Sequence, residues 1–469
     1  MRACRDGTAG TLAYGGPVPA SDDLPHRGVD AGPEAAPEAA DEAGVTGVTG
    51  ADEAPARPLT PLVAPRDGVP PVVADAEGLA RVVAAFAAGT GPVAVDAERA
   101  SGHRYGQRAF LVQLRRAGAG TALVDPAALP DLSALDAVLA DTEWVLHAAS
   151  QDLACLADVG LRPRLLFDTE LGSRLAGLHR VGLAAVVEEF LGLGLAKEHS
   201  AVDWSTRPLP EPWLRYAALD VEVLVDLRDA LAAELDRQGK LGWAREEFGA
   251  VLHAPPAPPR QDPWRRTSGL HRVRTRRQLA MVRELWDARD ALAREQDVSP
   301  GRILPETSVV EAALAAPTTL RALTTMSTFT GRGSRKHAQL WFDALERGRT
   351  LPDAQLPPQH LPTEGPPPAR VWAERDPVAA ARLSRARTAV AAIAAEHGLP
   401  VENLVSPDAV RRLMWSPPAP AGPDDVARVL RGHGVREWQV RLVAGPLAAA
   451  TEAVAEITDR RTEPEVTEQ

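Results

Sequence analysis

Hydrophobic and polar positions along the first half of the chain follow two different periods. Short apolar or alternating runs, which are typical of β-strands, occur at 92–96, 110–114, 122–125 and 144–147. Apolar residues recur every three or four positions, as they do in helices, at 132–139, 151–159, 183–191 and 213–235. Tight connections join the first three strands, which favours an antiparallel meander. Strands that then alternate with helices predict a layered α/β domain.

Two proline-rich segments divide the rest of the chain. Residues 251–263 and 352–368 favour extended, semi-rigid linkers rather than packed structure. They separate the α/β block at 70–250 from two blocks with helical periodicity, at 264–351 and 369–455. A chain of 469 residues is long enough for about two to four domains, so this division agrees with the length.

The two ends of the chain differ in composition from these blocks. Residues 1–69 are rich in Ala, Gly, Pro, Asp and Glu and have few bulky apolar side chains. Burial therefore cannot offset the entropy of ordering them, and we expect 1–69 to be a disordered acidic tail. Residues 456–469 are also acidic, and we expect a second tail there.

Composition excludes several classes of protein. No run of about 18 apolar residues predicts a membrane-spanning helix, and the first residues lack the basic-then-apolar layout of a secretory signal. The two cysteines, Cys4 and Cys155, cannot form a disulfide framework and do not form a CxxC pair. We therefore expect a cytoplasmic protein without a membrane partner, and we favour a monomer.

The formal net charge of −11 is unevenly distributed along the chain. Residues 71–250 carry 26 Asp and Glu against 17 Lys and Arg, whereas residues 251–350 carry 10 against 17. Clustered cationic side chains supply salt-sensitive affinity for phosphates. The overall acidity of the chain therefore does not exclude a nucleic-acid partner.

The candidate chemistry begins with two carboxylates at the end of the first predicted strand. Asp96 and Glu98 flank Ala97, and strand alternation places both carboxylates on one face of the sheet. Two close like charges repel and raise each other's pKa unless a cation lies between them. By itself this pair fits a solvated strand end better than a metal site, so it is weak evidence alone.

Further candidates lie on predicted helices. Asp152 is in the first turn of a helix that Ser150 is placed to cap, where the helix dipole stabilises a carboxylate. Tyr216 and Asp220 are four residues apart, so their side chains share one face of their helix. Each placement also has a purely structural interpretation, so none of these motifs decides the function alone.

Taken in order, these motifs resemble the ribonuclease D family of DEDD-type 3′→5′ exonucleases. That family has DxE in a strand, then HxxxxD, then YxxxD, and the corresponding residues here are Asp96, Glu98, Asp152, Tyr216 and Asp220. The intervening sequence is also similar, in FLVQL at 110–114, LVDP at 123–126, FDTE at 167–170, GLAAVVEE at 182–189 and DWSTRPL at 203–209. The resemblance covers about 70–235 and extends more loosely to about 455.

The resemblance implies both a fold and a chemistry. It implies an α/β ribonuclease-H-like exonuclease domain followed by two all-α domains of the HRDC type, the helicase-and-RNase-D C-terminal module. It also implies two divalent metal ions, Mg²⁺ or Mn²⁺, which prefer oxygen ligands. By analogy with the family, Asp96 bridges the two ions, Glu98, Asp152 and Asp220 complete their shells, and Tyr216 orients the attacking water.

The substrate that the resemblance implies is RNA with a single-stranded 3′ end, typically a transfer-RNA precursor. A DNA 3′ exonuclease on the same scaffold would need the same acids, so the acids cannot separate RNA from DNA. A non-catalytic nucleic-acid-binding protein should lack at least one ligand, whereas this chain has all four carboxylates and the tyrosine. Arg215, five residues before the last acid, replaces the histidine of the sister subgroup, so the tyrosine subgroup matches.

The helical blocks carry the rest of the resemblance. Residues 264–351 resemble an HRDC domain around the turn PGRILP at 300–305, and residues 369–455 look like a divergent second copy. Arginines on a helical surface are often only solvated, but one group in the first block is dense enough to bind backbone phosphates. This basic cluster consists of Arg332, Arg335 and Lys336.

Loops near the motifs supply further candidates. Two loops, one after the first predicted strand and one before the last motif, are interpreted either as solvated turns or as nucleic-acid contacts. The candidate contact residues are His103, Arg104, Tyr105, Lys197 and Trp204. His147 is interpreted as a core histidine at a strand end. Ala97 stands where the family commonly has a threonine whose hydroxyl lies near the terminal nucleotide, so the contacts there differ.

Overall fold

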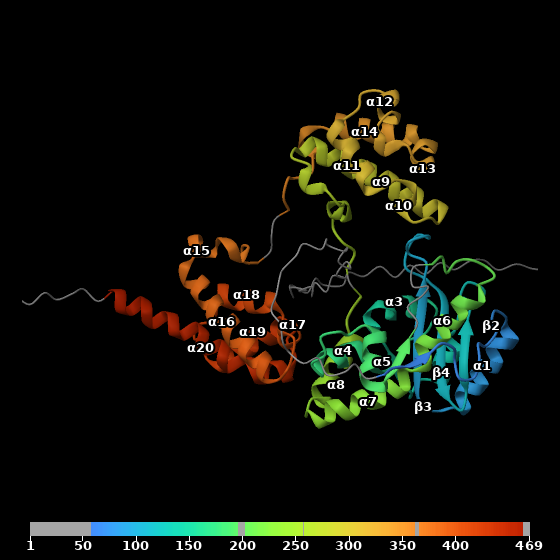
Figure 1. Ribbon diagram of the computed structural model, residues 1–469. Helices are drawn as coiled ribbons and strands as arrows, with labels where there is room; N and C mark the ends of the chain where they lie inside the picture. Colours follow the sequence, from blue (N-terminus) through green and yellow to red (C-terminus); the bar gives the residue numbers. More distant parts are fainter. Residues whose placement is uncertain (1–57, 196–201, 257, 362–364, 463–469) are drawn as a thin grey trace, which may run out of the picture. The chain divides into compact units, whose positions relative to one another are not determined.

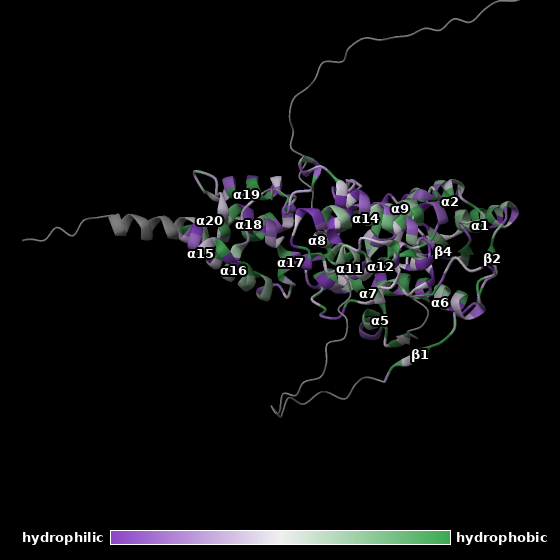
Figure 2. Cartoon of the chain, turned by 90° about the horizontal axis from the view of Figure 1, so that it is seen from above, coloured by the Kyte–Doolittle hydropathy of each residue, from purple (hydrophilic) through white to green (hydrophobic). Residues whose placement is uncertain are grey.

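The computed structural model describes residues 58–195, 202–256, 258–361 and 365–462 (Figure 1). Within these ranges an α/β domain is followed by two helical domains, which confirms the predicted fold class. No helix in the described ranges is both long and apolar enough to cross a membrane. Hydrophobic and hydrophilic residues instead mix along the helices (Figure 2).

A six-stranded mixed sheet forms the centre of the α/β domain, in the order β2-β5-β4-β3-β6-β7. Its strands are β2 (Val72–Val73), β3 (Thr90–Arg99), β4 (Ala109–Ala117), β5 (Gly120–Val124), β6 (Glu143–Leu146) and β7 (Leu165–Asp168). The β3-β4 and β4-β5 pairs are antiparallel, which confirms the predicted meander. The other three pairs are parallel. Periodicity alone missed β2 and β7, which have only two and four residues.

Helices surround the sheet and bring the remaining motifs to it. They are α1 (Ala76–Ala88), α2 (Ser133–Val138), η1 (Ala149–Gln151), α3 (Leu153–Asp158), α4 (Thr169–Leu175), α5 (Leu183–Leu191), α6 (Glu211–Glu222), α7 (Leu224–Arg237) and α8 (Leu241–Leu252). The single helix predicted at 213–235 is two helices, α6 and α7, which meet at Val223. Helix α6 packs against β3, β4 and β5, so the last motif lies beside the first.

The start of α3 differs from the expectation. The N-cap of α3 is Asp152 itself, and no side chain caps the helix there. Ser150 lies in the preceding η1 turn, so it does not cap α3. The Asp152 carboxylate is therefore not used in a capping bond and is available for other interactions.

Ordered structure begins before the α/β block predicted from composition. Strand β1 (Thr60–Leu62) pairs in parallel with β8 (Leu193–Leu195). Arg66 then forms ion pairs with Glu222 at 3.4 Å and Asp226 at 3.0 Å. The tail predicted at 1–69 is therefore too long at its C-terminal end, and residues 1–57 lie outside the described residues.

The first helical domain has its own core. Its helices are η2 (Pro263–Arg266), η3 (Leu270–Arg272), α9 (Arg276–Gln296), α10 (Pro300–Ile303), α11 (Glu306–Ala315), α12 (Leu320–Thr324), η4 (Ser327–Phe329), α13 (Arg332–Lys336), α14 (Ala338–Thr350) and η5 (Asp353–Gln355). A capping box of Thr275 and Gln278 starts α9. The fully buried rings of Phe329 and Trp341 pack in the core between the helices.

The second helical domain extends to the end of the described chain. Its helices are η6 (Ala369–Val371), α15 (Trp372–Arg375), α16 (Pro377–Glu396), α17 (Val401–Leu404), α18 (Pro407–Trp415), α19 (Pro423–Gly432) and α20 (Glu437–Thr462). Trp372 is fully buried, and its ring centroid is 4.8 Å from that of Trp415. Because α20 continues to Thr462, helical structure enters the predicted tail at 456–469.

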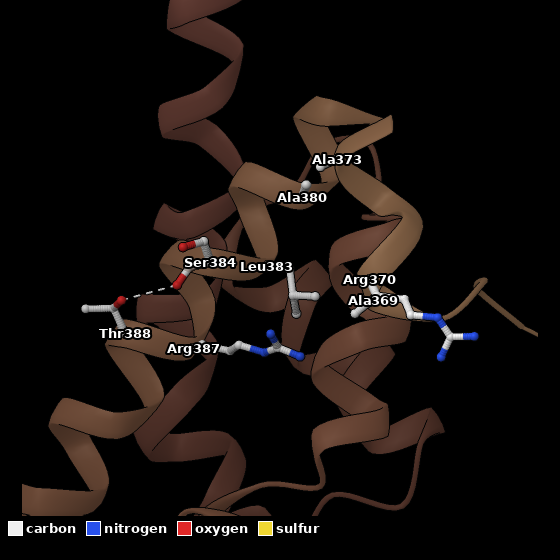
Figure 3. Close-up of a pocket in the computed structure, with 8 residues that line it drawn as sticks. All are labelled: Ala369, Arg370, Ala373, Ala380, Leu383, Ser384, Arg387 and Thr388. Carbon is white, nitrogen blue, oxygen red and sulfur yellow. Dashed lines mark hydrogen bonds between the residues drawn. The ribbon is translucent and has the colours of Figure 1, made fainter. Parts of the chain in front are cut away.

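A pocket of about 550 Å³ lies in this domain between η6, α15 and α16 (Figure 3). It is lined by Ala369, Arg370, Ala373, Ala380, Leu383, Ser384, Arg387 and Thr388. The Thr388 hydroxyl donates to the Ser384 carbonyl at 3.2 Å, so it is used within α16. None of the site residues predicted from the sequence lines this pocket, which is therefore separate from the acidic site.

Candidate active site

Three of the four predicted acids form one compact group. Carboxylate oxygens of Asp96, Glu98 and Asp220 all lie within 4.8 Å of one another. Strand β3 supplies the first two acids, and α6, packed across β3, supplies the third. Asp152 lies outside this group of three, but its charge still raises the pKa of Glu98. The structure therefore brings together the acids of all three motifs.

Burial and mutual repulsion raise the pKa of these acids. Burial is the largest cause for each, and the charge of Asp96 is the next for three of them. Together they raise the pKa of Glu98 to about 10 and that of Asp152 to about 8. The pKa values of Asp96 and Asp220 are also raised, in Asp96 by burial. Carboxyl groups that resist ionisation to this degree are those that a nearby cation would stabilise.

A buried glutamine touches both carboxylates of the first motif. Gln113 faces Asp96 across the β3-β4 pair, and its Nε2 lies 3.4 Å from Asp96 Oδ2 and 3.4 Å from Glu98 Oε1. The Gln113 side chain is fully buried, so it cannot turn to solvent. We infer that Gln113 orients the pair. The sequence shows Gln113 within FLVQL, but only the strand register reveals its partner.

Asp168 holds the turn that precedes Asp152. It accepts hydrogen bonds from the backbone N–H of Ala148 at 3.1 Å and of Ala149 at 2.8 Å. It also caps α4 by accepting two further backbone N–H groups. Ala148 has a φ of 59°, in the left-handed region that alanine disfavours. The Asp168 carboxylate therefore stabilises a strained turn and fixes where α3 begins, a role that the FDTE motif did not reveal.

Tyr216 and His147 stay neutral for different reasons. Burial and the charges of Asp220 and Glu98 raise the pKa of Tyr216 above its ordinary value, and its hydroxyl hydrogen-bonds with Asp220. Burial lowers the pKa of His147 to about 4, and its Nδ1 lies 2.9 Å from Thr169 Oγ1. Tyr216 thus belongs to the acidic group, whereas the interpretation of His147 as a core histidine at a strand end stays a prediction.

The loop after β3 has protein partners. Its contacts are between His103 and Asp203 at 3.4 Å, Arg104 and Ser205 at 2.8 Å, and Tyr105 and Asp290 at 3.1 Å. The Tyr105 ring also packs against the core of the first helical domain. The predicted nucleic-acid role of these three residues is not tested by these contacts and stays a prediction.

The other loop candidate is placed in the core. Trp204 is fully buried, and its ring meets that of Trp213 edge-on at 5.7 Å between centroids. A ring without exposed surface cannot stack on a base, so the prediction that Trp204 contacts nucleic acid is wrong for this structure. Lys197 lies outside the described residues.

The basic cluster lies on the surface of the first helical domain. Arg332, Arg335 and Lys336 are exposed on α13, and no ion pair joins any of them to an acid in the described chain. The backbone approaches closely here, since a Cβ on Gly333 would lie 3.0 Å from the Arg302 carbonyl. Phosphate binding by this cluster stays a prediction.

Comparisons with known proteins agree with this geometry. A family model described as a 3′-5′ exonuclease matches residues 71–236, and an HRDC domain model matches 278–345. A ribonuclease D of Gluconacetobacter diazotrophicus is 33% identical over 335 residues, which cover 69% of this chain and 81% of that protein. The chain belongs to the ribonuclease D family. It is a 3′→5′ exoribonuclease, a hydrolase of phosphodiester bonds.

Two solved structures extend the match to the helical domains. A protein from Bifidobacterium adolescentis is 40% identical with a TM-score of 0.77, over 84% of this chain and 100% of that one. Escherichia coli RNase D, described as an exoribonuclease involved in structured RNA processing, is 27% identical with a TM-score of 0.58, over 84% and 99%. The block predicted as a second HRDC copy matches, over 365–451, the model of the 3′ to 5′ exonuclease C-terminal domain.

The raised pKa values predict how the stability of the metal-free protein depends on pH. The folded pKa values of about 8 for Asp152 and about 10 for Glu98 exceed the unfolded values of about 4. The folded state therefore binds more protons, so this contribution to stability is complete below about pH 4 and is lost as pH rises through 8 toward 10. Melting temperatures in EDTA should fall steadily between pH 5 and pH 9.

The matched variant for this measurement is Glu98→Gln, which cannot ionise at that position. Its melting temperature should fall less than that of the wild type over the same pH interval. If the melting temperatures of the two proteins fell equally with pH, ionisation of Glu98 would not be a source of the instability.

Proposed function

We propose that Asp96, Glu98, Asp152 and Asp220 hold two divalent ions, Mg²⁺ or Mn²⁺, and that this site removes nucleotides from single-stranded 3′ ends of RNA. Transfer-RNA precursors are the proposed natural substrate. The observation that carries the proposal is the group of carboxylates from β3 and α6, those of Asp96, Glu98 and Asp220, whose oxygens lie within 4.8 Å of one another. Asp152, at the start of α3, is close enough for its charge to raise the pKa of Glu98. The description of the E. coli relative, an exoribonuclease involved in structured RNA processing, supports the substrate class.

The residues of the site fit hard divalent ions. The group of three within 4.8 Å offers only carboxylate oxygens, the ligands that Mg²⁺ and Mn²⁺ prefer. Asp152 Oδ1 and Gln113 Oε1 are buried and accept no hydrogen bond from the described residues. When bound, such ions would lower the pKa of a water molecule and offset the charge on the attacking and departing oxygens.

The protein's own groups then have distinct tasks. Gln113 keeps Asp96 and Glu98 in a fixed relation, and Asp168 fixes the turn before Asp152. Tyr216 keeps its phenol proton at neutral pH, since burial raises its pKa. A protonated phenol cannot act as a general base, so its hydroxyl orients the water that attacks phosphorus.

We also propose that the basic cluster on α13 contacts the RNA backbone. Its three exposed cations face no acid among the described residues, whereas most arginines of the exonuclease domain are ion-paired. Such contacts would be independent of sequence and would weaken as salt rises. They would supply affinity without taking part in the chemistry.

Replacing one ligand tests the metal site. The Asp220→Asn variant keeps the shape of the side chain but loses its charge, so turnover should fall by at least about 100-fold. Turnover is followed as stepwise shortening of 5′-labelled RNA and DNA oligomers with Mg²⁺, Mn²⁺ or EDTA. Wild-type shortening of RNA should require metal, and 3′-labelled RNA should release labelled mononucleotides first.

The control variant for Asp220→Asn is Asp229→Asn, which changes an exposed acid on α7. This variant should keep the wild-type rate. Full activity of Asp220→Asn, or activity in EDTA, would contradict the metal-site proposal, and faster shortening of DNA than of RNA would contradict the RNA assignment.

Removing one hydroxyl tests the role of Tyr216. In Tyr216→Phe the ring stays in place on α6, but the water loses its hydrogen-bond partner. We expect kcat to fall by about 10–100-fold, as loss of a hydrogen bond worth about 1.5–3 kcal/mol does, while Mn²⁺ affinity stays nearly unchanged. Single-turnover kinetics and calorimetric titration with Mn²⁺ measure the two quantities, and equal rates for both proteins would remove this role from Tyr216.

A further inference from the structure

One cation lies at the edge of the acidic site. The guanidinium of Arg99 is 3.3 Å from Asp152 Oδ1, and its side chain is 26% exposed. Within the described parts of the chain, no other cationic side chain forms an ion pair with the four acids. The charge of Arg99 also lowers the pKa values of Asp96, Glu98 and Asp152, against the larger effect of burial.

Arg99 lies at an irregularity in the sheet. Strand alternation alone would place Arg99 on the opposite face from Glu98. The register of β3 and β4 shifts here, because Glu98 pairs with Leu111 while Arg99 pairs with Ala109. Phe110 is therefore an extra residue in β4, and such a bulge changes the direction of nearby side chains. At this bulge the Arg99 guanidinium reaches Asp152 Oδ1.

The Arg99 guanidinium is held loosely. It makes no hydrogen bond to another residue in the described ranges, and its one ion pair is with Asp152. Arg207 offers a contrast, since it donates two hydrogen bonds to the Asp125 carboxylate and another to the Phe110 carbonyl. An arginine has five N–H donors in a planar fork that suits phosphate. The donors of Arg99 are thus available beside the acids, whereas those of Arg207 are used for structure.

The net charge of the proposed site with substrate bound favours an additional cation. Four carboxylates and two divalent ions balance, so an RNA phosphate that enters the site adds one uncompensated negative charge. That charge grows as the water oxygen approaches phosphorus. Arg99 supplies one positive charge at the edge of the same group of acids. The full set of groups is neutral only when Arg99 is counted.

We propose that Arg99 is a catalytic residue that donates hydrogen bonds to a non-bridging oxygen of the scissile phosphate. This inference rests on the proposed function of the four acids. In the reaction the water oxygen forms a bond to phosphorus, and the bond from phosphorus to the 3′ oxygen breaks. The water proton passes to solvent and the 3′ oxygen takes up a proton, which yields a nucleoside 5′-monophosphate and a shortened RNA. Arg99 forms no covalent bond. Its guanidinium releases the Asp152 carboxylate and donates to the phosphate instead.

The test compares Arg99→Gln and Arg99→Lys with the wild type in the full chain. Arg99→Gln should lower kcat on 5′-labelled RNA by about 100-fold, as loss of a preorganised donor to a developing charge does. Arg99→Lys should recover part of the rate, because it restores the charge but not the planar fork. The control is Arg164→Gln, which removes a 57% exposed arginine that pairs with Asp136 at 3.8 Å.

Two binding measurements separate a role at the phosphate from a role in holding Asp152. Calorimetry with adenosine 5′-monophosphate in Mg²⁺ should show affinity about tenfold weaker in Arg99→Gln, since a charged hydrogen bond to the phosphate is lost. Calorimetry with Mn²⁺ alone should show affinity unchanged or tighter, because a competing cation has gone.

Two results would overturn the inference. The first is a kcat of Arg99→Gln within about threefold of the wild type. The second is a parallel loss of Mn²⁺ affinity and rate, which would make Arg99 only a support for Asp152. Failure of the proposed function can be distinguished from failure of this inference. It would appear as metal-independent activity of the wild type or as full activity of Asp220→Asn, independently of the results for the Arg99 variants.

Discussion

The main physical constraint on this structure is that the fold holds several acidic side chains together although their charges repel one another. Oxygens of Asp96, Glu98 and Asp220 lie within 4.8 Å, and burial raises the pKa of each of these acids. A fold that needed only stability would not place carboxylates in this way, because buried like charges are costly unless a cation compensates them. The acidic group is therefore suited to bind divalent cations, which would offset the repulsion. The neighbouring strands and helices hold the carboxylates close together.

The scaffold resists that relaxation through its hydrogen bonds. Strand β3 pairs with β6 at Val93 and Ala94 and continues to pair with β4 at Asp96 and Glu98, so the backbone that carries the two acids is held in the sheet. Gln113 is buried beside both, and Asp168 fixes the turn before Asp152 with two backbone hydrogen bonds. Rigid supports of this kind favour catalysis because ligands that are already in place need no reorganisation when charge develops.

The sequence predicts the acids better than it predicts their supports. Asp96 and Glu98 follow from strand alternation, and Tyr216 with Asp220 follows from helical spacing, because both rest on local periodicity. The contacts of Gln113 and Asp168 and the bulge at Arg99 depend on which strands and turns become neighbours, and no local pattern carries that information. For Trp204 the sequence predicts a contact that the structure does not allow, since the residue follows a polar loop but its ring is buried in the core. The short strands β1 and β2 were missed because two or three residues hold no period.

The most direct measurement of this account is the number of Mn²⁺ ions bound per chain near neutral pH, with adenosine 5′-monophosphate present. Electron paramagnetic resonance of free Mn²⁺ in a titration counts the bound ions. The account predicts two ions for the wild type and fewer for Asp96→Asn, which removes the charge of one of the four acids proposed to hold them. A wild type that binds no Mn²⁺, or an Asp96→Asn variant that binds as many ions as the wild type, would contradict it.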